Sequence, residues 1–164
     1  MIYLRRAKEE DLSIIRNLAE QIWPAAYSDI ISQGQIEFML EKMYNHGELL
    51  AQLREGHTFL IASDAHEDVG FAGFSIIDSE QHIFKLHKLY VLPKMHGKGV
   101  GKILINEVFD KVKAENGKFL QLNVNKANKA KDFYEKAGFY IKYSTVLDIG
   151  NGFYMDDYVM EKEI

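Results

Sequence analysis

Hydrophobic positions recur with two different periods along this chain, and each change of period marks the start of a new element. Apolar residues spaced three or four apart predict helices over residues 11–23, 32–44, 48–54 and 100–113. Shorter runs rich in branched and aromatic side chains predict strands over residues 2–6, 58–63, 69–78 and 119–125. Pro24 cannot donate a helical hydrogen bond, so we expect it to end the first helix.

The C-terminal part of the chain continues the same mixture of periods. Asn128 is placed to begin a helix and Gly138 to end it, because asparagine caps helix starts and glycine accepts the left-handed conformation that follows them. Two alternating stretches, 140–149 and 153–161, flank Gly150-Asn151-Gly152 and predict a terminal hairpin.

Composition narrows the class of protein. Strands and helices alternate over residues 1–164 without repeats or linkers, which predicts a single domain of the α/β (α+β) class. The net charge of −4 argues against non-specific binding to nucleic acid and leaves room for a cationic small substrate. No cysteine is present and the 6 histidines are scattered, so we expect neither a disulfide nor a metal site. No apolar signal segment or membrane-length run occurs, so we expect a cytoplasmic protein without a membrane partner.

One stretch carries the clearest chemical signal. A strand that ends at Pro93 is followed by the alternating glycines of Gly97-Lys98-Gly99-Val100-Gly101 and then by a long helix. Glycines allow positive φ angles and close approach of a ligand, and the free N–H groups of a helix N-terminus bind anions. The stretch therefore predicts a phosphate site. A P-loop is disfavoured because Ile103 rather than Ser or Thr follows Lys102, and a dinucleotide fingerprint would need glycine at Lys102.

This loop resembles the coenzyme A pyrophosphate loop of the GCN5-related N-acetyltransferases, the GNAT family. The family loop is usually written Arg or Gln, two residues, Gly, one residue, Gly or Ala. Gly99 and Gly101 match it, and His96 stands in the Arg or Gln place. A second segment, from Asn125 to Phe139, looks like the family's spaced asparagines followed by Phe-Tyr-x-Lys-x-Gly-Phe. Both motifs occur in the family's order, and the resemblance covers the chain from about Thr58 onward.

The resemblance implies a twisted mixed sheet of about seven strands whose central pair splays apart, with acetyl-coenzyme A as the co-substrate and no metal. On the splayed strand, the backbone of Leu89 and Val91 would pair with the pantetheine arm. The other coenzyme contacts would come from the glycine-rich loop, the asparagines and the following helix: His96, Gly97, Lys98, Gly99, Val100, Gly101, Lys102, Asn125, Asn128, Lys131 and Tyr134.

The resemblance further implies direct transfer of an acetyl group to a primary amine, with Tyr134 as the proton donor to the coenzyme A thiolate. The base that deprotonates the amine is left open. His87 shares the strand parity of the coenzyme-contacting residues and titrates in the useful range, while Asp78, Glu80 and a chain of water molecules are the alternatives.

Aromatic and apolar residues supply the candidates for the acceptor pocket. Trp23, Tyr27 and Ile30 lie at the predicted connection after the first helix, and Tyr154 is expected opposite them. The acidic balance favours a polyamine-like small molecule as acceptor, with a protein N-terminus or lysine as the alternative. A non-catalytic acyl-coenzyme A sensor is the competing hypothesis from another class. The sequence leaves the acyl chain length and the oligomeric state open, and a homodimer is one of the possible oligomeric states.

Overall fold

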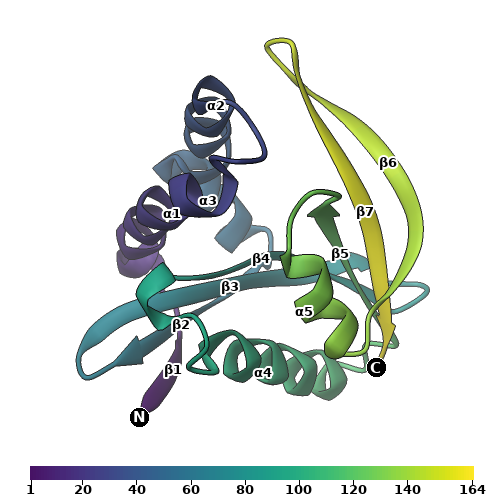
Figure 1. The fold of residues 1–164 in the computed structure, drawn as a ribbon. Helices are drawn as coiled ribbons and strands as arrows, with labels where there is room; N and C mark the ends of the chain where they lie inside the picture. The colour runs from purple at the N-terminus through teal and green to yellow at the C-terminus, as the bar shows by residue number, and fades with distance from the viewer.

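Seven strands form one mixed sheet in the computed structural model, which describes the chain from Met1 to Ile164 (Figure 1). Their spatial order is β1-β2-β3-β4-β5-β7-β6, and β4 and β5 are the parallel pair among antiparallel neighbours. The strands are β1 (Ile2–Arg6), β2 (Thr58–Asp64), β3 (Glu67–Asp78), β4 (Ile83–Val91), β5 (Phe119–Asn125), β6 (Tyr140–Gly150) and β7 (Phe153–Glu163). The predicted mixed sheet is confirmed.

Helices cover the two faces of this sheet unequally (Figure 1). The face that we call the α1 face carries α1 (Leu12–Tyr27), α2 (Gln33–Tyr44) and α3 (His46–Arg54), and the opposite α4 face carries α4 (Val100–Ala114) and α5 (Ala130–Lys136). Two short 3-10 helices, η1 (Glu9–Asp11) and η2 (Pro93–Met95), precede α1 and α4. None of the helices combines the length and the apolar character that crossing a membrane requires.

The core follows the periodicities read from the sequence. On α4, residues three and four apart pack under the sheet: Val100, Leu104, Val108 and Val112 are all buried. Strand alternation sends Leu120, Leu122 and Val124 of β5 to the same side. These side chains belong to one contiguous cluster of buried residues that continues through the sheet to α1, so both layers share one core.

The first helix runs on through Pro24 to Tyr27, so the prediction that Pro24 ends it is wrong. The Pro24 carbonyl still accepts a hydrogen bond from the Ser28 N–H at 3.1 Å, which keeps the last turn helical. A proline in a helix interior costs about 3 kcal/mol. On either side of it Trp23 and Tyr27 are buried, and fully burying a large apolar side chain gains about 1.5–3 kcal/mol. Tertiary packing therefore outweighs the local rule.

The parallel pairing of β4 with β5 is short. It spans four residue pairs, from Ile83 with Phe119 to Leu86 with Leu122, and then ends. Beyond this point β4 stays on β3 while β5 stays on β7, so the two central strands diverge (Figure 1). The predicted splayed pair is confirmed, and it opens the sheet at its middle.

A bulge lies in β4 where the splay begins. Lys88 pairs with Gly73 and Leu86 pairs with Phe74, so His87 is the extra residue of the strand. Its imidazole contacts Ser75 and His57 on the α1 face, whereas the Val91 side chain lies beside Gly70 and Gly101 next to α4. The expectation that His87 shares the face of Leu89 and Val91 is therefore wrong, because an extra residue reverses the alternation on one side of it.

The β6–β7 hairpin reaches back over the sheet to α2. Lys42 Nζ donates to the Ile149 carbonyl at 2.6 Å, and the rings of Phe38 and Phe153 lie 5.4 Å apart. Gln35 Nε2 donates to the Tyr154 carbonyl at 2.8 Å. The hairpin tip and α2 are therefore in direct contact.

Packing at the turn after α4 predicts that Gly117→Ala destabilises the protein by about 1–3 kcal/mol. A Cβ at this position would lie 2.3 Å from Val112 Cγ1 and 2.9 Å from the Val112 carbonyl oxygen. The control is Gly47→Ala in α3, whose Cβ would meet nothing closer than 3.4 Å and which should be neutral or stabilising by up to about 1 kcal/mol. Urea unfolding measures both; equal stabilities of the two variants would contradict this account of the turn.

Candidate active site

The opening between β4 and β5 continues into a cleft of about 920 Å³. Four parts of the chain line it: the end of α1, the exposed half of β4, the loop before α4, and the segment from the end of β5 into α5. Most of the residues that the sequence marks as functional come from these segments. The fold thus gathers positions that are up to 112 residues apart in the chain, from Ile22 to Tyr134, around one space.

The loop before α4 forms an anion cradle. Gly97 and Gly99 have φ angles of 79° and 81°, which is the left-handed region that glycine occupies without strain. Gly99 is the N-cap of α4, and its carbonyl accepts from the Ile103 N–H at 3.0 Å. The N–H groups of Val100, Gly101 and Lys102 have no backbone acceptor and begin the helix at its positive end. A Cβ at Gly99 would meet nothing within 4 Å, so the cradle is open.

The basic side chains around this cradle differ in position. His96 and Lys102 line the cleft, and His96 Nε2 lies 3.2 Å from the Val91 carbonyl oxygen, with which it forms a hydrogen bond. Lys98 and Lys131 are not among the lining residues, and Lys131 Nζ pairs with Glu135 at 2.8 Å. The groups of the cradle that are free to bind an anion are therefore mainly backbone N–H groups.

The exposed edge of β4 offers further backbone groups. The Leu92 N–H donates to the Val69 carbonyl of β3 at 2.8 Å, which makes Leu92 and Val69 a hydrogen-bonded pair. Since hydrogen-bonded and non-hydrogen-bonded pairs alternate along antiparallel strands, Leu89 and Val91 direct their N–H and C=O groups away from β3. Because β5 has separated from β4 at this point, these groups face the cleft, where an extended ligand can pair with them.

Three tyrosines stand where the strands diverge. The hydroxyls of Tyr27 and Tyr90 share a hydrogen bond of 2.9 Å. Tyr134 lines the cleft from α5, is 8% exposed, and no side chain of the protein hydrogen-bonds to its hydroxyl. Burial, and to a smaller extent the nearby Tyr27, raises the pKa of Tyr134 well above the ordinary value. Tyr134 therefore keeps its proton at any working pH and has a hydroxyl free to donate.

The two asparagines of the second motif both organise local turns. Asn128 Oδ1 accepts from the Ala130 N–H at 2.9 Å. Asn125 Oδ1 accepts from the Ala127 N–H at 2.9 Å. Asn128 lines the cleft and Asn125 does not. The N-cap of α5 is Lys129, so the prediction that Asn128 caps this helix is wrong by one residue, because the Asn128 side chain forms a turn just before it. The coenzyme role of Asn128 stays a prediction.

His87 lies in a cluster on the α1 face. Its Nε2 lies 2.7 Å from Ser75 Oγ, and its ring stacks on His57 at a centroid distance of 4.5 Å. Burial, with smaller contributions from His57 and the lysines nearby, lowers the pKa of His87 to about 3. An imidazole of such low basicity is neutral at physiological pH and is a poor general base.

The acceptor-side aromatics do not all reach the cleft. Tyr27 and Ile30 line it. Trp23 is 1% exposed and lies behind them, packed on Tyr27 at 4.7 Å and on Tyr90 at 5.7 Å. Tyr154 is 57% exposed and meets α2 through its carbonyl rather than its ring. Trp23 therefore supports the wall, and Tyr154 is outside it.

The lining residues that sequence reasoning missed include Lys88, Tyr90 and Asn123. Lys88 is buried, donates to Gln52 Oε1 at 3.0 Å and lies over the Tyr44 ring. Burial lowers the pKa of Lys88 to about 8. The polar groups of Lys88 and Tyr90 within the strand Ile83–Val91 were the available signal, but only the bulge brings both side chains to the α1 face.

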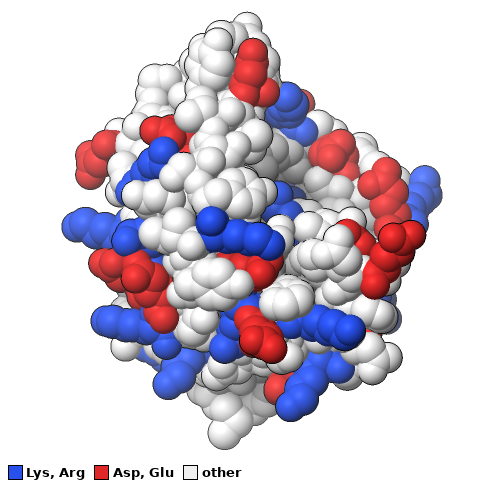
Figure 2. All heavy atoms as spheres, turned by 90° about the vertical axis from the view of Figure 1, so that its right-hand side faces the viewer, with Lys and Arg blue, Asp and Glu red and all other residues white.

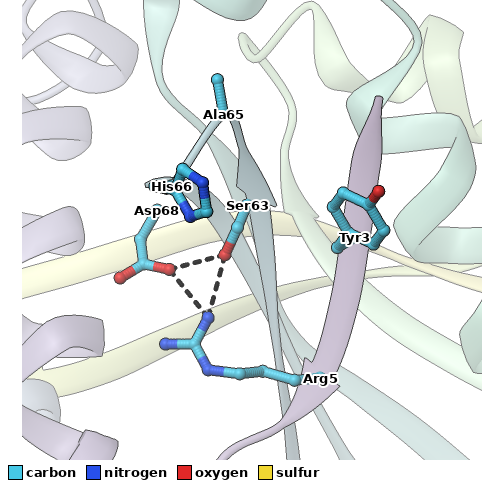
Figure 3. A pocket seen from close by; sticks show the side chains of 6 residues that line it. All are labelled: Tyr3, Arg5, Ser63, Ala65, His66 and Asp68. Carbon is cyan, nitrogen blue, oxygen red and sulfur yellow. Dashed lines mark hydrogen bonds and ion pairs between the residues drawn. The ribbon is translucent and has the colours of Figure 1, made fainter.

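A second hollow, of about 560 Å³, lies at the β1–β3 edge of the sheet (Figure 3). Arg5 Nη1 donates to Ser63 Oγ at 2.9 Å and to Asp68 Oδ1 at 2.8 Å, so its charged groups satisfy one another. These three side chains are already paired with one another, and the hollow lacks the anion cradle and the free strand edge of the cleft at the splay, which is the better candidate.

The face of the molecule drawn in Figure 2 carries no large field of one charge. On the face turned toward the viewer in Figure 2, Lys and Arg are interspersed with Asp and Glu, and the surface is hollowed in the upper half of the view. No group of three or more His, Cys, Asp or Glu side chains is arranged to hold a metal ion. The mixed charge suits a small ligand better than an extended polyanion.

Comparisons with known proteins agree with this geometry. The Acetyltransferase (GNAT) domain family matches residues 55–141. A spermidine N(1)-acetyltransferase from Thermoplasma acidophilum is 26% identical over 168 residues, which cover 99% of this chain and 97% of the relative. An uncharacterized N-acetyltransferase from Mycobacterium bovis is 31% identical over 156 residues, or 94% of this chain and 98% of that protein. The crystal structure of the PaiA N-acetyltransferase from Thermoplasma acidophilum in complex with coenzyme A superposes with a TM-score of 0.83 at 26% identity, over 100% of this chain and 99% of that one.

The open cradle predicts that Gly99→Asp weakens binding of acetyl-coenzyme A by about two orders of magnitude or more, because it adds a negative charge where phosphates would sit. Gly152→Asp is the matched control: its φ of 78° imposes similar backbone strain, and a Cβ there also meets nothing within 4 Å. Both variants should lose similar stability, and calorimetric titration should show a binding defect only for Gly99→Asp. Wild-type affinity in a folded Gly99→Asp protein would place the phosphates elsewhere.

Proposed function

The chain belongs to the GNAT family of acetyltransferases, and from that premise we propose that this acetyl-coenzyme A-dependent N-acetyltransferase acts on a small cationic amine. The observation that carries the proposal is the convergence of three features on one cleft. These are the unpaired N–H groups at the start of α4, the free backbone edge of β4, and the unbonded Tyr134 hydroxyl.

Each feature suits one part of acetyl-coenzyme A. The pyrophosphate would lie on the cradle formed by Gly99, Val100 and Gly101, where N–H groups and the helix dipole favour anions. The pantetheine arm, which carries amide groups, would pair with Leu89 and Val91 as an additional strand. His96 would contribute beside the cradle, close to the Val91 carbonyl.

The co-substrate supplies an activated thioester, and the protein's own residues supply position and a proton. The amine nitrogen bonds to the carbonyl carbon while the carbon–sulfur bond breaks, and a water molecule in the open cleft takes up the proton that the amine loses. The N–H groups of the β4 edge are placed to polarise the carbonyl. Tyr134, kept protonated by burial, donates its hydroxyl hydrogen to the departing sulfur. His87 is not assigned as the base, since its pKa of about 3 makes it too weak.

The nature of the acceptor rests on two observations. The Thermoplasma acidophilum relative, which aligns over nearly the whole length of both chains, is a spermidine N(1)-acetyltransferase. The present chain has a net charge of −4, which attracts cationic metabolites and repels acidic ones at long range. Both favour a polyamine-like acceptor over an acidic metabolite.

A panel of acceptors tests this proposal. Release of free thiol from acetyl-coenzyme A would be followed with spermidine, with amino acids and with peptides that present a free N-terminus or a lysine. We expect turnover with spermidine-like amines. Tight coenzyme binding without turnover on any acceptor would favour the sensor hypothesis, and turnover on peptides alone would identify a protein acetyltransferase.

The role of Tyr134 predicts that Tyr134→Phe lowers kcat by about 100-fold, since a general acid contributes about 10²–10⁴-fold and a thiolate is a good leaving group. The ring and its packing on Phe139 stay in place, so the melting temperature and the Kd for acetyl-coenzyme A should be nearly unchanged. Tyr143→Phe, at a half-exposed position on β6, is the control and should be silent. An unchanged kcat in Tyr134→Phe would assign the proton to another donor.

A further inference from the structure

Two carboxylates are buried on the same face of β7. Asp157 is 3% exposed and Glu161 is 4% exposed. Phe153 of the same strand packs on Phe38 of α2, and the β5–β7 register is regular, so the alternate residues Phe153, Asp157 and Glu161 all face the α1 side. Burying a charged group is costly unless it is paired and hydrogen-bonded, so each of these carboxylates needs a partner.

Glu161 has its partners within the protein. Its carboxylate accepts from Gln121 Nε2 at 2.7 Å, from the Tyr140 hydroxyl at 2.8 Å and from Lys142 Nζ at 2.9 Å. These three interactions lower the pKa of Glu161 even though burial acts in the opposite direction. Glu161 is therefore a completed structural ion pair.

Asp157 has no such set. Its Oδ1 is fully buried and has no hydrogen-bond partner. Burial raises the pKa of Asp157, and the side-chain amide of Asn123 and the more distant charge of Lys85 offset this effect only in part. A buried unsatisfied acceptor typically costs about 1–3 kcal/mol, and more when it is charged. This deficit distinguishes Asp157 from Glu161 on the same strand.

The position of Asp157 connects it to the cleft. It pairs in register with Asn125, at the end of β5 that has separated from β4. Asn123, which lines the cleft, lies on the same face, and the charge of Asp157 acts on the hydroxyl of Tyr27. Tyr27 lines the cleft from the end of α1, so Asp157 lies close to that wall of the cleft although it is not itself a lining residue. This is the acceptor side of the site.

We propose that Asp157 is the carboxylate that binds a second, non-reacting ammonium group of the acceptor amine. The inference rests on the proposed function. The amine that attacks the thioester must be neutral, so a cation held beside a carboxylate has to be another group of the same molecule. A diamine or polyamine has one at a fixed distance along its chain, and its ammonium would complete the hydrogen bonding of Asp157. A monoamine would leave this carboxylate unsatisfied.

The experiment compares kcat/KM for spermidine with that for n-propylamine and n-butylamine, which carry the same reactive ends without a second charge. In the wild type we expect kcat/KM for spermidine to exceed that for either monoamine by about 10- to 100-fold, which is the contribution of a charge-assisted hydrogen bond. Asp157→Asn should remove most of that preference through KM, with acetyl-coenzyme A affinity and the monoamine kcat nearly unchanged. Its melting temperature should be equal or higher, because a buried amide is cheaper than an unpaired carboxylate.

Asp156→Asn is the matched control, since it removes the same charge from the adjacent residue, which is exposed and pairs with Lys126. It should keep the preference. If Asp157→Asn does not fold, Asp157→Ser, which is smaller, serves in its place. A preference retained without Asp157, or equal use of monoamine and spermidine by the wild type, overturns the inference while acetyl transfer stands. A wild type that acetylates no amine overturns the inference together with the proposed function.

Discussion

The end of pairing between β4 and β5 is the constraint on which the site depends. After four parallel pairs the strands separate, and the backbone groups of Leu89 and Val91 are left without a partner inside the sheet. Backbone groups without a sheet partner need other hydrogen bonds: His96 supplies one to the Val91 carbonyl, and the proposed coenzyme would supply others. The loop at the end of β4 then continues directly into the α4 N-terminus, so the strand edge and the anion cradle belong to one ligand path.

The acceptor side depends on a different detail, the single extra residue at His87. Below the bulge, Phe84 and Leu86 are buried toward α4, and above it Lys88 and Tyr90 pack among aromatic side chains of α1, α2 and β2. One strand thus contributes to the hydrophobic core with one half and to the polar site with the other. A regular strand would have turned Lys88 into the core beneath α4, where no hydrogen-bond partner such as Gln52 is present.

Several polar groups at the site lack a full set of hydrogen-bond partners, a property that the buried Trp23 Nε1, the Tyr44 hydroxyl and His57 Nδ1 share. The Arg5–Ser63–Asp68 triad and the Glu161 cluster are saturated by their own neighbours (Figure 3). The Tyr134 hydroxyl, the first N–H groups of α4 and Asp157 are buried or half-buried without a full set of partners. Such groups lower stability unless something binds to them. Tyr134 and the first residues of α4 line the cleft, and Asp157 lies on the strand next to its lining residue Asn123.

Much of the fold could be read from the sequence, because periodicity and turn chemistry are local. The strand Phe119–Asn125, the cap at Ser32 and the helix from Val100 follow from patterns of a few residues, and the structure confirms them. The glycine loop and the Phe-Tyr-x-Lys-x-Gly-Phe segment were sufficient to indicate the coenzyme half of the site, since its contacts are made by backbone groups at fixed sequence spacing. The end of α1 was missed at Pro24, where the burial of Trp23 and Tyr27 outweighed a local penalty.

The acceptor half was decided by tertiary structure alone. Nothing in the sequence around His87 shows that it is a bulge, because the bulge exists only in the register with β3. The burial of Trp23 behind Tyr27 depends on how α1 packs over β4, and the exposure of Tyr154 depends on how the hairpin meets α2. Asp157 is one of two adjacent acidic residues in a strand of the sequence. Only the folded chain shows that Asp156 reaches solvent while Oδ1 of Asp157 is buried without a hydrogen-bond partner. The periodicity of the sequence assigns a residue to one face of a strand or helix. The groups that this residue contacts there are decided by the packing of the folded chain.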